Sequence, residues 1–213
     1  MQTTALIDYG SGNVHSARRA LLEAARQGER EVEVVLTGDP AVIVSADRIV
    51  LPGVGHFAQC RGALADKAGV IDALEEAVLD RATPFLGICV GMQLLADFSL
   101  EDGDARGLGW LHGAVQPIEP GPGLPVPHMG WNALIPQGRH PVLADLGPRP
   151  HAYFVHSFAM SPENARHIAA LAEYGRPLVA AVANGPIFGT QFHPEKSQSV
   201  GLKILSNFLR WAP

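Results

Sequence analysis

The 213-residue sequence is short of cysteine and of charged side chains, and both shortages exclude classes of protein. Its two cysteines, Cys60 and Cys89, stand 29 positions apart with no Cys-x-x-Cys pair, which excludes a disulfide-stapled fold and a zinc ribbon. Only 17% of the residues are charged against 47% that are hydrophobic, a balance that disordered chains do not have. A chain of this length can bury a core without such staples.

Long apolar runs and basic clusters are also missing. The most apolar stretch, residues 85–96, is shorter than the roughly 20 residues that a membrane-crossing helix needs. Residues 1–4 lack the basic start of a signal peptide. A net charge of −5 with no Lys/Arg cluster argues against nucleic-acid binding. We therefore expect a cytoplasmic protein of one domain, residues 1–213, that binds neither membrane nor nucleic acid.

Short apolar runs alternate with helical spacing in the first half of the chain. This alternation predicts an α/β fold, a single domain with a mainly parallel central sheet flanked by helices. From about residue 108 to 184, strand-like runs without convincing helices predict a smaller antiparallel or mixed sheet. The expected strands are 5–7, 32–36, 48–51, 84–88, 131–135, 152–159, 168–171 and 178–183; the expected helices are 13–26 and those around 70–78 and 200–211. Residues 117–127 hold five prolines, which favour a rigid loop over an SH3-binding segment.

Cys89 lies in the most informative segment, Gly87-Ile88-Cys89-Val90-Gly91. Between an expected strand and an expected helix, Gly-x-Cys-x-Gly is the pattern of a nucleophile elbow with cysteine as the nucleophile. The amides and the positive end of the following helix would favour a thiolate. The alternative is that Cys89 is a small buried hydrophobe, the usual state of a free cysteine. Cys60 has no such setting, and we expect it to pack within a helix.

A thiolate nucleophile needs a base, and the base needs a group that orients it. His193 and Glu195 flank Pro194, so in an extended segment both side chains project to one side. The carboxylate could then hold one ring nitrogen while the other faces sulfur. An ordinary surface turn is the alternative, and the Cys89 elbow makes a Cys-His-Glu triad the better interpretation.

A cradle for the reaction's oxyanion is expected after the strand at 48–51. Gly53 and Val54 begin a Gly-x-Gly turn whose amides can point inward, and the amide of Val90 would be the second donor. Gly10-Ser11-Gly12 is a weaker candidate for such a cradle. It does not form a dinucleotide-binding site, because His15 stands where that fingerprint needs glycine. We expect no cofactor. No His, Cys, Asp and Glu set has ligand spacing, so we also expect no metal.

These segments together resemble the class I, triad-type glutamine amidotransferases, from residue 5 to the last helix. More narrowly, the sequence is similar to the glutaminase subunits of imidazole glycerol phosphate synthases. Beside the elbow and His-Pro-Glu, the segments that carry the resemblance are Asp8-Tyr9-Gly10-Ser11-Gly12-Asn13, Leu51 to Phe57, Pro127-His128-Met129-Gly130-Trp131-Asn132, and Tyr153 to Phe158. Residues 94–99 and 26–33 depart from the family pattern without touching a catalytic position.

The resemblance implies roles for particular residues. Cys89 attacks the glutamine amide, His193 moves the proton, and Glu195 orients His193. The Gly53–Val54 peptide supplies an oxyanion amide, with a peptide flip triggered by the partner's ligand as one way to reach it. Glutamine is held by Gly55, Gln93, Ser157 and Phe158, and the partner interface contains Asn13, Trp131, Tyr153 and Lys196. Solvated or packing roles remain the alternative for Trp131 and Lys196, and His128 and His156 are assigned to no chemistry.

The resemblance also implies a partner. In the family, ammonia passes to a (β/α)8-barrel cyclase subunit, which makes imidazole glycerol phosphate and an aminoimidazole carboxamide ribonucleotide in histidine biosynthesis. The two subunits form a heterodimer. Three other hypotheses stay open. The chain could be a glutaminase subunit of another amidotransferase, a stand-alone cysteine hydrolase on the same fold, or a binding protein whose triad is idle.

Overall fold

The central sheet explains why the elbow and the His-Pro-Glu segment meet. The computed structural model describes residues 1–101, 103, 105–119 and 121–213. Its eight-stranded sheet has the order β2-β1-β3-β4-β14-β13-β12-β9, and the first five of these strands run parallel. The strands are β1 (Gln2–Ile7), β2 (Val32–Thr37), β3 (Arg48–Gly53), β4 (Phe85–Cys89), β14 (Ile187–Thr190), β13 (Pro177–Asn184), β12 (Ile168–Glu173) and β9 (Ile135–Pro136).

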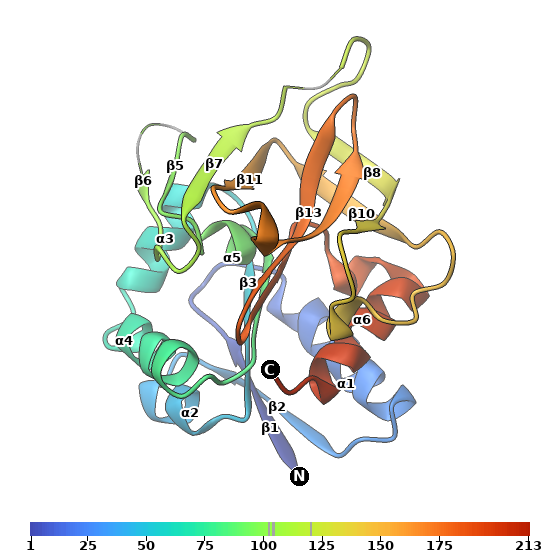
Figure 1. Cartoon of the computed structure of the whole chain (residues 1–213). Helices are drawn as coiled ribbons and strands as arrows, with labels where there is room; N and C mark the ends of the chain where they lie inside the picture. Colours follow the sequence, from blue (N-terminus) through green and yellow to red (C-terminus); the bar gives the residue numbers. More distant parts are fainter. Residues whose placement is uncertain (102, 104, 120) are drawn as a thin grey trace.

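Helices cover both faces of this sheet, as Figure 1 shows. On one side α1 (Val14–Gln27) packs against α6 (Gln198–Arg210). The other side carries α2 (Pro40–Ser45), α3 (Phe57–Ala65) and α4 (Val70–Glu75), the last continued by a π-helical turn, Glu76–Asp80. Buried alanines and Leu21 form the inner stripe of α1, at the helical spacing found in the sequence. The predicted α/β fold is confirmed.

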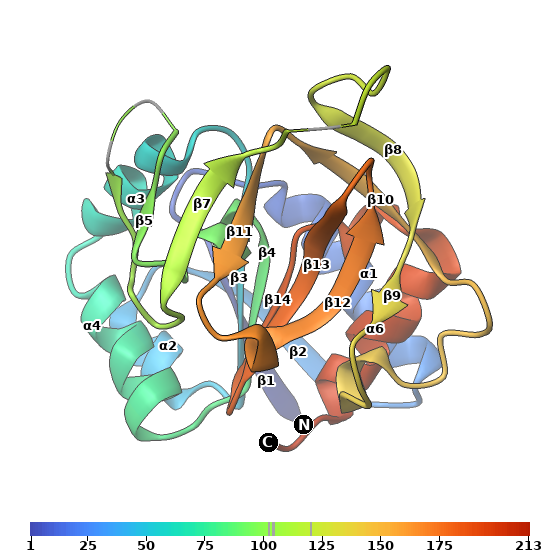
Figure 2. The same ribbon diagram turned by 45° about the horizontal axis from the view of Figure 1, so that its top comes forward.

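Two smaller sheets lie beyond the carboxyl ends of the parallel strands (Figures 1 and 2). One pairs β10 (His151–His156) with β8 (His128–Ala133), and the other has the order β11-β7-β5-β6. The members of the second sheet are β11 (Phe158–Pro162), β7 (Gly113–Pro117), β5 (Phe98–Ser99) and β6 (Ala105–Arg106).

The single strand expected over 152–159 is wrong. The chain forms β10 and β11, which belong to different sheets, and it changes direction at Ser157. The carbonyl of Ser157 accepts the amide of Ile118, so the change of direction is held by the loop after β7. Similarly, the run at 131–135 divides between β8 and β9. Neither run contains a glycine or proline at its break, so the residues that usually mark a turn are missing there.

The proline-rich segment is the connection between β7 and β8. Pro120, one of its five prolines, lies outside the described residues. The hydroxyl of Tyr174 donates to the Pro125 carbonyl at 2.7 Å, which ties this connection to the end of β12. The described part of the segment is therefore a loop held against the sheet, as its prolines predict.

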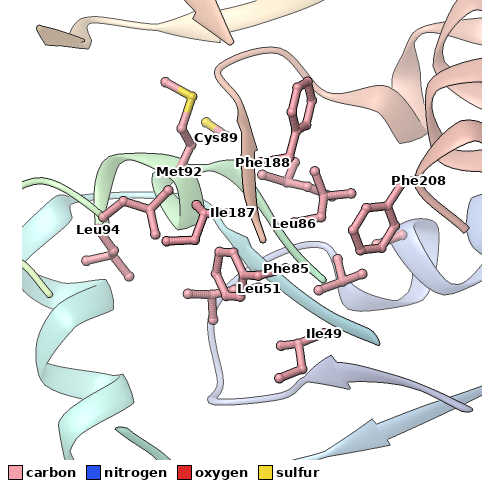
Figure 3. Packing of buried hydrophobic residues seen from close by; sticks show 14 of the residues in the cluster. Ile49, Leu51, Phe85, Leu86, Cys89, Met92, Leu94, Ile187, Phe188 and Phe208 are labelled. Atoms are coloured by element: carbon pink, nitrogen blue, oxygen red, sulfur yellow. The ribbon is translucent and has the colours of Figure 1, made fainter. Parts of the chain in front are cut away.

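The apolar core surrounds the strand that carries the cysteine. Phe85 and Leu86 on β4 are fully buried with Leu51 on β3 and Phe188 on β14, and Cys89 stands at the end of this packed strand (Figure 3). A reactive side chain at this position is held by a rigid support. Across the described residues, no helix is both long and apolar enough to span a bilayer.

Candidate active site

Cys89 occupies a strained turn directly at the end of β4. Its backbone has φ 55° and ψ −111°, a conformation that residues other than glycine rarely adopt. The turn is tight: a Cβ on Gly87 would lie 2.6 Å from the Gly91 carbonyl oxygen, and one on Gly91 would overlap the Leu51 carbonyl. The glycines on both sides of Cys89 are therefore required by the backbone of the elbow.

The helix expected after Cys89 is present but short. α5 (Val90–Gln93) is a single turn, because the next carbonyls bond to another segment instead of continuing the helix. The Leu94 carbonyl accepts from the Leu108 amide at 2.7 Å, and that of Leu95 accepts from the Leu111 amide at 2.9 Å. A one-turn helix has few aligned peptides, so the local amides at Cys89 matter more than a macrodipole.

His193 and Glu195 follow β14, the parallel neighbour of β4. His193 Nδ1 and Glu195 Oε1 are 2.8 Å apart, and the two side chains are only 2% and 3% exposed. Within the described part of the chain, neither His193 Nε2 nor Glu195 Oε2 has a hydrogen-bond partner. Nε2 is the nitrogen left for a reacting group, since Glu195 holds the other one.

The charge state of His193 reflects opposing influences. Burial lowers the pKa of the imidazole, but the neighbouring Cys89 sulfur and the Glu195 carboxylate together raise it to about 9. Cys89 therefore acts on the imidazole although it makes no hydrogen bond of normal length with Nε2. Such contacts are commonly long in the absence of substrate and tighten when it binds. A protonated imidazole facing the sulfur would favour a thiolate.

A cleft of about 430 Å³ opens over Cys89, a volume suited to a small molecule. It brings together most of the residues predicted for catalysis and binding. Four predicted residues are not in its wall: Gly53, Glu195, Trp131 and Tyr153. Its wall is formed by Asn13, Val54, Gly55, Cys89, Val90, Gln93, Glu101, Val155, His156, Ser157, Phe158, His193 and Lys196.

Two glutamines connect the far wall of the cleft to the cysteine. Gln93 Nε2 donates to the Phe158 carbonyl at 2.9 Å and to Gln191 Oε1 at 3.0 Å. Gln191 Nε2 in turn donates to the sulfur of Cys89 at 3.7 Å. Both N–H groups of Gln93 are thus used, so its Oε1 is the atom left to accept a bond from a ligand.

Side chains hold the carbonyls on both sides of the Gly53–Val54 peptide. Tyr9 donates to the Pro52 carbonyl at 2.8 Å, and Ser11 donates to the Val54 carbonyl at 2.9 Å. Cys60 was expected only to pack. It is buried, but its sulfur also lies 3.1 Å from Ser11 Oγ and 3.4 Å from the Val54 carbonyl oxygen. Burial raises the pKa of Cys60, which keeps the thiol a neutral donor.

Comparison with known proteins decides the family. The family model described as glutamine amidotransferase class-I matches residues 5–211. The chain belongs to the class-I glutamine amidotransferases. The resemblance stated from the sequence is confirmed, and with it the prediction of an enzyme that hydrolyses glutamine with a cysteine.

Relatives within this amidotransferase family are similar over the full length. The protein named imidazole glycerol phosphate synthase subunit HisH of Rhodospirillum rubrum is 54% identical over 98% of this chain and 99% of its own. The protein of the same name from Caulobacter vibrioides is 50% identical over the whole of both chains. These matches also confirm the narrower resemblance, to the HisH subunit.

Solved amidotransferase structures have the same fold. A glutamine amidotransferase crystal structure aligns with TM-score 0.69 over 97% of both chains at 19% identity. A Thermotoga maritima glutamine amidotransferase aligns with TM-score 0.61 at 17% identity, over 91% of this chain and 76% of its own. At such identities the likeness concerns the fold alone.

Three of the four predicted interface residues of this amidotransferase lie side by side. Trp131 and Tyr153 are directly paired across β8 and β10, with ring centroids 6.0 Å apart, and the Lys196 ammonium lies 5.8 Å from the centre of the Tyr153 ring. Trp131 is 48% exposed. Asn13 caps α1 by accepting the amide of Ser16 at 3.3 Å, and it also reaches the cleft. The four remain a predicted interface.

Sequence reasoning missed two residues of the site. Gln191 stands two positions before His193 and contacts the sulfur, but its role depends on a fold that brings β14 next to β4. Glu101 lines the cleft and accepts the amide of Phe57 at 2.8 Å. It follows β5, a two-residue strand that periodicity cannot detect. In the described part of the chain, no group of three or more His, Cys, Asp or Glu could hold a metal ion.

Proposed function

We propose that this chain is the glutaminase subunit of an imidazole glycerol phosphate synthase and that Cys89, His193 and Glu195 are its catalytic triad. One observation carries the assignment of the triad: a buried His193–Glu195 pair, 2.8 Å apart, raises the basicity of an imidazole whose other nitrogen is left for the strained cysteine of the elbow. Similarity to HisH proteins over the full length supports the choice of synthase.

The reaction starts when the Cys89 thiolate attacks the side-chain carbonyl carbon of L-glutamine. The carbonyl oxygen becomes an oxyanion, for which the amides of Val54 and Val90 are the donors. His193 gives its proton to the amide nitrogen, the C–N bond breaks, and ammonia leaves a thioester on the sulfur. Water then loses a proton to His193 and attacks the thioester, which releases glutamate and restores the thiolate. Glu195 holds the imidazole and balances its charge.

The wall of the cleft supplies the contacts that a free amino acid needs. Glu101, 13% exposed in its side chain, offers a carboxylate to the substrate's ammonium group. Gln93 offers its Oε1, since both of its N–H groups are used within the protein. The carbonyl of Ser157 is taken by Ile118, so Ser157 binds substrate through its amide or its hydroxyl. Gly55 and Phe158 complete the binding surface through their backbones.

Ammonia then passes to a (β/α)8-barrel cyclase subunit, which forms imidazole glycerol phosphate and the aminoimidazole carboxamide ribonucleotide. The interface of this heterodimer contains Asn13, Trp131, Tyr153 and Lys196. Two observations support it: Trp131 and Met129 are large apolar side chains exposed together on β8, and Asn13 and Lys196 also reach the cleft in which ammonia forms. We place the complex in the cytoplasm, where histidine is made.

A glutaminase assay with and without the cyclase and its nucleotide ligand tests this function. The chain alone should hydrolyse glutamine feebly, and the liganded partner should stimulate it strongly. Cys89→Ala should abolish glutamine-dependent synthesis while leaving synthesis from added ammonium salts intact, because the acceptor site belongs to the partner. Full activity of the isolated chain would favour a stand-alone hydrolase, and loss of ammonium-dependent synthesis would show that Cys89 is structural.

A further inference from the structure

Two buried histidines lie at the glutamine cleft, and the triad mechanism uses neither: His156 is part of the cleft wall, and His128 is its neighbour outside that wall. His128 on β8 and His156 on β10 face each other directly across the two-stranded sheet, and they are 3% and 7% exposed. His128 Nδ1 and His156 Nε2 are 3.0 Å apart, a hydrogen-bond distance. A buried pair of this kind must have its donors and acceptors in a definite order, because two ring nitrogens cannot both donate to each other.

The backbone fixes that order. His156 Nδ1 lies 2.9 Å from the Phe158 carbonyl oxygen, which can only accept, so Nδ1 carries the proton. His156 Nε2 then accepts from His128 Nδ1, and His128 Nε2 accepts from Asn132 Nδ2 at 3.1 Å. Asn132 is itself oriented, since its Oδ1 accepts the Ala133 amide at 2.8 Å and its Nδ2 also donates to the Glu173 carbonyl.

Both imidazoles have to be neutral for this order to hold. Burial lowers the pKa of His128, and burial lowers that of His156 to about 4. The charged His193 imidazole also disfavours a second cation at His156. Phe154 stacks on the His128 ring, and Tyr174 packs on it with centroids 4.1 Å apart. Rings packed in this way keep their orientation, so the order of donors is preserved.

The last acceptor of this series belongs to the cleft. The Phe158 carbonyl accepts from His156 and also from Gln93 Nε2, and Gln93 continues through Gln191 to the sulfur of Cys89. A carbonyl with two donors is fixed in direction, and a fixed carbonyl determines which way the Gln93 amide faces. If the carbonyl turned away, Gln93 could rotate and present N–H groups to the substrate where Oε1 should be.

We propose that His128 and His156 are positioning residues for glutamine binding: as a hydrogen-bonded pair they aim the Phe158 carbonyl at Gln93 and thereby keep Gln93 Oε1 facing the substrate. The inference rests on the proposed glutaminase function. It assigns His128 and His156, which take no part in the triad mechanism, an effect on the KM for glutamine. It also connects the cleft to Asn132, the neighbour of the exposed Trp131 on β8.

The test uses the complex with the cyclase subunit and compares glutamine-dependent with ammonium-dependent synthesis. His156→Phe keeps a ring beside Phe154 but removes both hydrogen bonds, and it should raise KM for glutamine roughly tenfold, the effect of about one lost hydrogen bond. kcat should change less than threefold, and ammonium-dependent synthesis should not change. His156→Asn, whose amide can donate near the position of Nδ1, should recover most of the affinity.

His140→Phe is the matched control, because His140 is another histidine whose pKa burial lowers to about 4, and it stacks on Phe188 instead. It should leave KM unchanged. An equal rise of KM in this control, or an unchanged KM in His156→Phe, would overturn the proposal. A wild-type complex without any glutaminase activity would instead refute the function.

A spectroscopic measurement keeps the proposal testable if His156→Phe fails to fold. Ring nitrogen chemical shifts of the wild-type chain, with His193 assigned separately, should place the proton of both His128 and His156 on Nδ1. Free histidine prefers the other tautomer in water, so this outcome reports the ordered pair. A proton on Nε2 of either ring would contradict the order of donors and with it the proposal.

Discussion

Replacing Glu195 by glutamine isolates the electrostatic part of the proposed triad. The amide of the Glu195→Gln variant would keep an oxygen for His193 Nδ1, now 2.8 Å from Glu195 Oε1, but would lose the charge. The pKa of His193 stands at about 9 against an ordinary 6.5, which at about 1.36 kcal/mol per unit is about 3 kcal/mol of stabilised imidazolium. Burial lowers this pKa while Cys89 and Glu195 both raise it, and we assign Glu195 about half of the net stabilisation, about 1.5 kcal/mol.

The same 1.5 kcal/mol predicts both a rate and a pH dependence. Glu195→Gln should lower kcat for glutamine at least about tenfold without affecting ammonium-dependent synthesis. Because the folded pKa of His193 is raised, its contribution to stability is complete below pH 6.5 and is lost as the pH rises through about 9. Raising the pH from 6 to 9.5 should therefore lower the free energy of urea unfolding by about 1.5 kcal/mol less in the variant than in the wild type.

Glu119→Gln is the control for this experiment. Glu119 also pairs with a cation, Arg176 at 3.0 Å, but its side chain is 77% exposed, and such pairs contribute little. The control should keep the wild-type rate and the wild-type loss of stability between the two pH values. A kcat within twofold of wild type for Glu195→Gln, with an unchanged pH dependence, would refute the role given to the carboxylate.

Three further substitutions examine the elbow, the oxyanion turn and the interface. Gly91→Ala forces a Cβ onto the Leu51 carbonyl and should cost more than about 2 kcal/mol in urea unfolding; an unchanged midpoint would contradict the close approach. Ser11→Ala removes the 2.9 Å bond that holds the Val54 carbonyl. The ratio of partner-stimulated to unstimulated glutaminase activity should then fall, and an unchanged ratio would show that Ser11 takes no part in the response to the partner. Trp131→Ala should raise the Kd for the cyclase at least about tenfold with less than about 1 kcal/mol lost from the fold, because Trp131 is half-exposed; an unchanged Kd would remove it from the interface.

The parallel half of the sheet could be predicted because each strand there is a short apolar run between turn residues. Strands expected at 5–7, 48–51 and 84–88 correspond to β1, β3 and β4. The elbow was equally visible, since Gly87 and Gly91 are imposed by local crowding of the backbone. Local sterics leave a signature in the sequence.

Contacts between segments that are distant in the chain leave a much weaker signature in the sequence. Nothing in the run 151–162 marks Ser157 as a corner, because the corner is imposed by bonding to Ile118 in another strand connection. The one-turn length of α5 is decided in the same way, by amides from Leu108 and Leu111. Gln191 became recognisable as a neighbour of the sulfur only once β14 was known to lie beside β4.

The position of β14 also has a consequence for the order in which the protein is made. β14 lies between β4 and β13, and its residue Ile187 pairs with Phe85, about a hundred positions earlier in the chain. During synthesis Cys89 therefore leaves the ribosome long before β14 and the His193 that follows it. Such non-local pairing is slow to form. A nascent chain accordingly carries Cys89 without His193, and glutamine hydrolysis by the proposed triad has to wait until β14 enters the sheet.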